Sequence, residues 1–228
     1  MSTFHEAWFE QMRITRADLV GRVVPVLVRH GVVFEGDARG LAWNGRLGRF
    51  AADSGQEVEG SPSLSLAIDE TRDWECACFD LRFMRWSTEL YLFSGADPEG
   101  GTQGVGLSFP GGLFDDAEDD PGLAARWLAL HADLGMALGS ATMICGIGVL
   151  MARADSARLL SIARRTLAAT EPEPDSTLVH TLLCRKSEGA VVLDEMRSAG
   201  WASHDLGNDY RMVTKLRFGR PSFDRLFA

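Results

Sequence analysis

The chain has 228 residues, of which 46% are hydrophobic and 24% are charged. A chain of this length and composition can bury a substantial core, which excludes disordered, collagen-like and disulfide-scaffold classes. The formal net charge is -9, so the protein would repel a phosphate backbone, and we expect no nucleic-acid partner.

The first predicted element is a helix that begins near Thr15 and stops at His30–Gly31. Thr15 and Asp18 have the spacing of a capping box, in which the side chain of the first residue accepts a backbone hydrogen bond. Pro25 falls inside the pattern and should kink or shorten the helix. Apolar residues then return to one face at a period near 3.6: Leu19, Val20, Val23, Val24, Leu27 and Val28.

From Val32 to Pro110 the pattern favours an antiparallel meander of strands. Apolar and polar residues alternate along Ser63–Ile68 and Phe79–Phe83, and Leu90–Phe93 is a short β-type run. Residues 105–109 predict an edge strand that ends at Pro110. The glycine-rich run 100–106 has no Gly-Lys-Ser/Thr after it, so we interpret it as a hairpin connection rather than a phosphate-binding loop.

After an acidic loop at 115–120, the second half contains a well-marked helix. Asp120 precedes Pro121 at its start, and Gly139 follows its last apolar residue. Residues 142–151 predict a buried strand or a tightly packed helix, and 177–184 suits either structure. The remaining predictions are helices at about 155–169 and 190–199 and a strand at 210–218.

These elements predict an α+β fold in which an antiparallel sheet from the first half packs with several amphipathic helices. We expect a single domain over residues 1–228. The only candidate for an internal boundary is the proline-containing stretch near residues 171–175.

The sequence also predicts a compartment. Its N-terminus has no basic and apolar signal-peptide pattern, and its longest apolar stretch is too short for a membrane span. Four scattered cysteines form no disulfide framework and lack zinc-finger spacing, so we expect reduced thiols and no metal. We therefore expect a cytoplasmic protein without membrane contact. Lysine makes up only two of the 23 basic residues, which is typical of a high-GC bacterial genome.

No catalytic constellation is apparent, and we expect no cofactor. His131 with Asp133, or His204 with Asp205, has the residue types of a general base and its orienting acid. Such neighbours arise easily by chance, and His131 fits a half-buried position on its helix. The acidic run lacks the alternation and the glycine of a calcium-binding EF-hand.

The leading hypothesis is a non-catalytic bacterial protein that binds a protein partner through an acidic surface. Residues 1–152 carry 22 Asp and Glu against 11 Arg and Lys, which favours a basic partner such as a toxin or nuclease. An immunity-type inhibitor needs such a surface and no active site. The alternative is a small hydrolase or transferase that uses His131 or His204. The expected docking residues are Trp74, Trp86, Asp115, Asp116, Glu118, Asp119 and Asp120.

Overall fold

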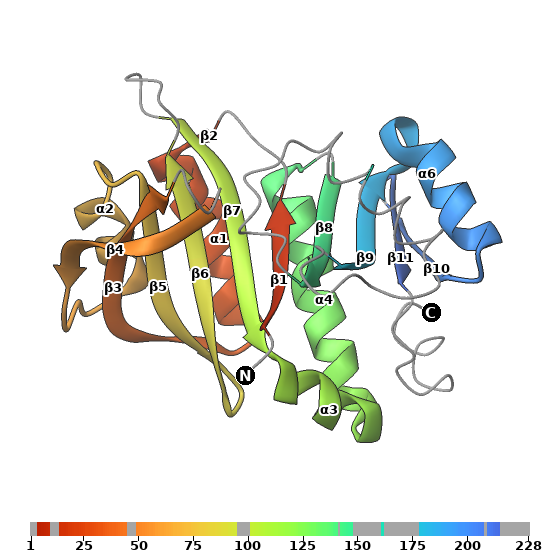
Figure 1. Ribbon diagram of the computed structural model, residues 1–228, viewed down its shortest axis with the longest axis horizontal. Coiled ribbons are helices and arrows are strands. Elements are labelled where there is room, and N and C mark those ends of the chain that lie inside the picture. The colour runs from red at the N-terminus through yellow and green to blue at the C-terminus, as the bar shows by residue number, and fades with distance from the viewer. Residues whose placement is uncertain are drawn as a thin grey trace.

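One antiparallel sheet organises the molecule. The computed structural model describes residues 4–9, 14–44, 49–94, 101–140, 142–147, 161, 178–207 and 209–214. Ten strands lie in the order β10-β11-β9-β8-β1-β7-β6-β5-β3-β4, and the short β2 also pairs with β7 (Figure 1). Their bounds are β1 Phe4–Phe9, β2 Ile14–Thr15, β3 Val32–Asn44, β4 Arg49–Val58, β5 Cys76–Phe83, β6 Trp86–Ser94, β7 Gly101–Pro110, β8 Thr142–Ile147, β9 Leu178–Arg185, β10 Ala202–Gly207 and β11 Tyr210–Thr214.

The predicted fold class is wrong. We expected a sheet made by the first half and helices in the second, but β8, β9, β10 and β11 from the second half extend the same sheet. The fold is therefore dominated by the sheet. The single-domain organisation stays a prediction, and the proposed boundary near 171–175 lies outside the described residues.

Helices cover both faces of the sheet at different places. Helices α1 (Arg16–Arg29) and α4 (Pro121–Leu138) contact each other behind the sheet, with α2 (Leu64–Glu70) beside α1 (Figure 1). Helix α6 (Lys186–Ser198) packs on β9 and β11, where it buries Leu182 and Val213 in a second, smaller core. Helix α3 (Gly111–Asp119) connects the end of β7 to α4.

The first helix forms as predicted. The Thr15 hydroxyl accepts a hydrogen bond from the backbone N–H of Asp18 at 3.1 Å, which supplies the expected cap. Pro25 does not end the helix, which continues to Arg29. Gly31 follows with a φ of 71°, a left-handed conformation that glycine adopts without steric cost.

The strand predicted at Ser63–Ile68 is wrong, because these residues begin helix α2. The Ser63 hydroxyl caps the helix by accepting from the backbone N–H of Leu66 at 3.3 Å. Leu64, Ala67 and Ile68 are buried at positions i, i+3 and i+4, which is the spacing of one helix face. The apparent alternation arose because Leu66 is apolar but 50% exposed, whereas Ala67 is buried.

Two predictions are wrong here: the glycine-rich run is not a hairpin connection, because residues 101–106 belong to strand β7, and residues 105–109 of the same strand do not form an edge. Strand β7 lies inside the sheet, with β6 on one side and β1 on the other. A Cβ at Gly104 would lie 2.2 Å from the Trp8 ring, so glycine is required for the indole to cross β7. Pro110 ends the strand, as predicted.

In the second half of the chain, the structure decides between strand and helix for the two segments that the sequence left open. Residues 142–147 and 178–185 are both strands, and α6 and β11 match the predicted last helix and strand within the described residues. The helix predicted at 155–169 lies outside the described residues except for Ser161. All four cysteines are buried free thiols. No helix among the described residues is long and apolar enough to cross a membrane.

Candidate functional site

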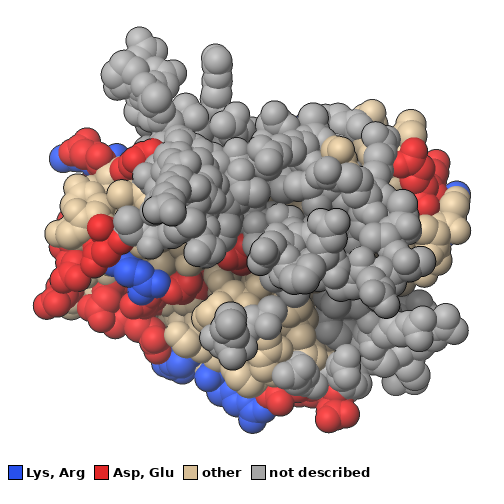
Figure 2. Space-filling view, in the orientation of Figure 1, with Lys and Arg blue, Asp and Glu red and all other residues tan. Residues whose placement is uncertain are grey.

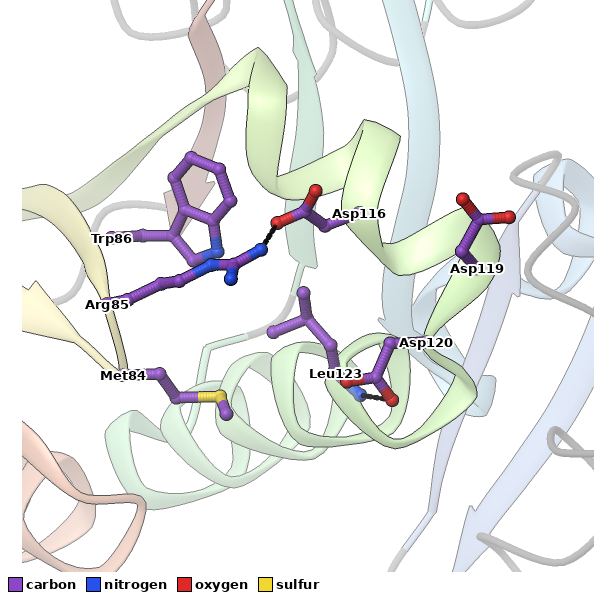
Figure 3. Close-up of a pocket in the computed structure, with 7 residues that line it drawn as sticks. All are labelled: Met84, Arg85, Trp86, Asp116, Asp119, Asp120 and Leu123. Atoms are coloured by element: carbon purple, nitrogen blue, oxygen red, sulfur yellow. Dashed lines mark hydrogen bonds and ion pairs between the residues drawn. The ribbon is translucent and has the colours of Figure 1, made fainter.

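A pocket of about 460 Å³ lies where the turn between β5 and β6 faces the junction of α3 and α4 (Figure 3). Three chain segments build it. Its lining combines apolar and charged side chains: Met84, Arg85, Trp86, Asp116, Asp119, Asp120 and Leu123.

The turn supplies one wall. Phe83, the last residue of β5, pairs with Trp86, the first residue of β6, so only Met84 and Arg85 connect the strands. Met84 has a φ of 57°, a left-handed conformation that costs a residue other than glycine about 1–2 kcal/mol. A strained tight turn therefore presents three consecutive side chains to the pocket.

Helix α3 supplies the opposite wall, and its helical period selects the acids that face the pocket. Leu113, Phe114 and Ala117 are buried against the main core. The Phe114 ring stacks on His5 with the centroids 3.8 Å apart, which anchors the helix on β1. The acidic run was predicted to be a loop, but its first five residues are helical.

Asp116 and Asp119 therefore lie three positions apart on one face of α3, and Asp120, the residue after the helix, also lines the pocket. Asp120 also caps α4, as predicted. Its Oδ1 accepts hydrogen bonds from the backbone N–H groups of Gly122 at 2.9 Å and Leu123 at 3.2 Å.

Arg85 bridges the two walls. Its guanidinium donates a hydrogen bond to Oδ2 of Asp116, and its Cζ lies 5.2 Å from the centre of the Trp86 ring (Figure 3). The Arg85 side chain is 73% exposed and that of Asp116 34%, so the pair is accessible to solvent. An exposed pair of this kind contributes little to folding, about 0–1 kcal/mol.

The Trp86 indole is held more firmly than Arg85. Its ring packs close to Gly112, where a Cβ would lie 3.2 Å from the ring atoms. Its Nε1–H is buried and has no hydrogen-bond partner among the described residues. An unsatisfied buried donor costs about 1–3 kcal/mol, so this tryptophan is positioned at an energetic cost.

The structure brings together four of the seven expected docking residues: Trp86, Asp116, Asp119 and Asp120. Trp74 lies elsewhere, after α2, where it is partly buried and packs on the main core. The side chains of Asp115 and Glu118 lie outside the described part of the structure.

The two histidine candidates are not paired with their sequence neighbours. His131 is fully buried rather than half-buried, and its Nδ1–H donates to the carbonyl oxygen of Trp127 at 2.7 Å. Asp133 instead contacts Nε2 of His30 at 2.8 Å. Burial lowers the pKa of His131 to about 4, so the ring is neutral at pH 7.

Asp205 likewise does not orient His204. Its carboxylate accepts hydrogen bonds from Lys186 Nζ at 2.8 Å and from the backbone N–H of Gly207 at 3.1 Å. These hydrogen bonds, that of Lys186 foremost, lower the pKa of Asp205. In the contacts that the structure describes, both aspartates are thus engaged by groups other than the predicted histidines.

Sequence reasoning missed a polar cluster on the face of β3, β5 and β6. Arg39 donates to Asp80 at 3.1 Å and also to Glu89, and Tyr91 donates to Glu89. The alternation of Cys78, Asp80 and Arg82 along β5 is the signal that could have indicated a polar face.

This cluster has three potential ligand atoms within 4.8 Å of one another, from Cys78, Asp80 and Glu89. The Arg39 guanidinium already forms ion pairs with both carboxylates. Burial raises the pKa of the Cys78 thiol, which disfavours the thiolate that a metal would require. The arrangement fits an internal ion-pair network better than a metal centre.

Asp and Glu side chains also gather on the surface at the β3–β5 end of the molecule (Figure 2). Glu35, Asp37, Glu57 and Glu59 are exposed there. Of these, Glu35 is paired with Arg82 at 3.0 Å. The negative charge is therefore not confined to the pocket.

Comparison with known proteins does not identify a family for this chain. No family model matches the chain, and no curated protein matches it at a significant level. Among solved structures it is similar to a T6SS protein of Pseudomonas aeruginosa, with a TM-score of 0.45, 12% sequence identity and 96% of this chain covered. The chain spans 66% of the length of that protein chain. A likeness this distant carries no argument about function.

Proposed function

We propose that this chain is a non-catalytic bacterial protein that binds and blocks a basic protein partner, as an immunity-type inhibitor does. The observation that supports the proposal is the convergence of Trp86 with Asp116, Asp119 and Asp120 in one open pocket. An aromatic anchor within a charged rim is the arrangement that dominates binding energy at many protein interfaces.

The charge of the chain suits this role. The formal net charge of -9 gives a basic partner a long-range attraction that raises its association rate. The exposed carboxylates of the pocket would then select the orientation in which the partner docks. Because contact with a partner excludes water, the same charges would interact more strongly in the complex than in the free protein.

The alternative of a hydrolase or transferase receives less support. His131 is buried among aromatic rings, with Trp127 at a centroid distance of 4.1 Å. Asp133 and Asp205 are both engaged with other side chains. Neither neighbouring pair offers the proton transfer that this function would require.

Affinity capture with three baits tests the proposal. The baits are the wild-type chain, the pocket variant Asp116→Asn/Asp119→Asn and the control variant Glu57→Gln/Glu59→Gln, which removes the same charge from the β4 region. Proteins retained at low and high salt are quantified by mass spectrometry.

We expect one basic protein to be retained in stoichiometric amount by the wild-type and control baits. It should be lost from the pocket variant and released at high salt. If no basic protein is retained, or if the pocket variant retains it as well as the control does, the proposal is wrong.

A further inference from the structure

We infer that the pocket receives an arginine side chain of the partner, and that Arg85 occupies this position in the free protein as an internal stand-in. This inference rests on the proposed function and identifies the chemistry of the group that docks. Three observations on the pocket support it.

The first is that the pocket already binds a guanidinium group. Arg85 donates to Asp116 and lies over the Trp86 ring at 5.2 Å, which combines a charged hydrogen bond with a cation–π contact. A planar guanidinium can make both contacts at once, whereas the compact and strongly hydrated ammonium of lysine stacks poorly. The site is therefore built for arginine rather than for positive charge in general.

The second observation is that the pocket carries an excess of negative charge. Three carboxylates line it, and Arg85 is the only cation among the described lining residues. Asp119 is exposed and forms no ion pair in the described structure. The three carboxylates exceed the one positive charge, so the pocket attracts a partner's guanidinium even while Arg85 occupies it.

The third is that Arg85 can leave at little cost. Its side chain is 73% exposed and stands on a turn of two residues, so it can rotate into solvent without disturbing the core. The volume of about 460 Å³ falls in the range of pockets that enclose whole ligands. An incoming arginine can therefore exchange with Arg85 on Asp116 and Trp86.

Titration of the ¹⁵N-labelled full chain tests this inference. The probes are the peptides acetyl-Gly-Arg-Gly-amide and acetyl-Gly-Lys-Gly-amide, which carry the same charge. The readout is the indole N–H signal of Trp86, identified by its loss in Trp86→Phe.

We expect the arginine peptide to shift the Trp86 signal saturably and to bind at least about threefold more tightly than the lysine peptide. The variant Asp119→Asn should weaken this binding. Arg85→Gln should strengthen it by a similar factor, because the internal competitor is removed.

The variant Arg72→Gln provides the matched control, since it removes one exposed positive charge from the turn after α2. If Arg72→Gln strengthens binding as much as Arg85→Gln does, the effect is general charge and the stand-in role is wrong. If the two peptides bind equally and through Asp119, the preference for arginine is wrong but the acidic docking surface remains. If neither peptide shifts Trp86, the inference fails, and the three-bait capture then decides separately on the proposed function.

Discussion

Arg85 and Asp116, 31 positions apart in the chain, form an ion pair across a pocket whose third partner is the Trp86 ring. The contact joins the turn after β5 to helix α3, which makes the β7–α3 corner responsible for the geometry of the site. The stability of the fold that carries the site depends on features that can be tested one at a time.

The cap at Asp120 is the first such feature. Replacing Asp120 with Ala removes the side-chain oxygen that accepts from Gly122 and Leu123, and should reduce the free energy of unfolding by about 1 kcal/mol. Asp120→Asn keeps a good capping side chain and should change it by a few tenths. Urea denaturation of both variants measures the difference. Equal stability losses would mean that the charge, and not the cap, supports α4.

The close approach of Trp8 to Gly104 predicts a large effect of one methyl group. A Cβ placed 2.2 Å from the indole must displace the ring or the strand, so Gly104→Ala should destabilise the fold by about 1–3 kcal/mol. Gly21 in α1 provides a control, because a Cβ there meets nothing within 4 Å. Gly21→Ala should stabilise the fold by about 0.5–1 kcal/mol. A thermal shift of the same sign in both variants would contradict this account of β7.

His131 predicts how stability depends on pH. Its pKa is about 4 in the folded chain, below the ordinary value of 6.5, so the unfolded chain binds the proton more readily. The free energy of unfolding should therefore fall as the pH drops from about 6.5 to 4, by about 3 kcal/mol for this group. His131→Phe cannot titrate, and its stability should vary less over this interval. An unchanged pH profile in His131→Phe would show that another group is responsible.

The Arg39 network predicts coupling between residues of β3 and β6, which are separated in the sheet by β5. Arg39 contacts both Asp80 and Glu89, and its side chain is 40% exposed, so solvent weakens each contact. A double-mutant cycle with Arg39→Met and Glu89→Gln should give a coupling free energy of about 1 kcal/mol. The cycle requires urea denaturation of the wild type, both single variants and the double variant. Additive effects would mean that the ion pair does not stabilise the sheet.

Much of the local structure could be predicted from the sequence, because it depends on neighbouring residues. The caps at Thr15 and Asp120 lie within a few residues of the backbone groups that they bind. The order of the strands could not be predicted in this way. Strand β1 lies between β7 and β8, which are far from it in the chain. The second half therefore joins the sheet through the pairing of β8 with β1, which no local pattern encodes.

The site was predictable only in part, for the same reason. The acidic run and Trp86 are visible in the sequence, but their juxtaposition depends on how α3 packs on β1. Once α3 is known to be a helix, its period places Asp116 and Asp119 on one face, whereas Asp120 follows the helix and caps α4. Trp74 resembles Trp86 in its charged neighbours, and both are partly buried on the main core. Of the two, only Trp86 lines the pocket with the acids of the β7–α4 connection, because adjacent charges do not determine which distant segment a side chain faces.

The rate of association between the chain and its captured basic partner tests the central claim most directly. It is measured by stopped-flow at several ionic strengths for the wild type, Asp116→Asn/Asp119→Asn and Glu57→Gln/Glu59→Gln. We expect the pocket variant to associate about tenfold more slowly at low salt, with a shallower salt dependence, while the control stays near the wild type. An unchanged rate and salt dependence in the pocket variant would contradict the assignment of this pocket as the docking site.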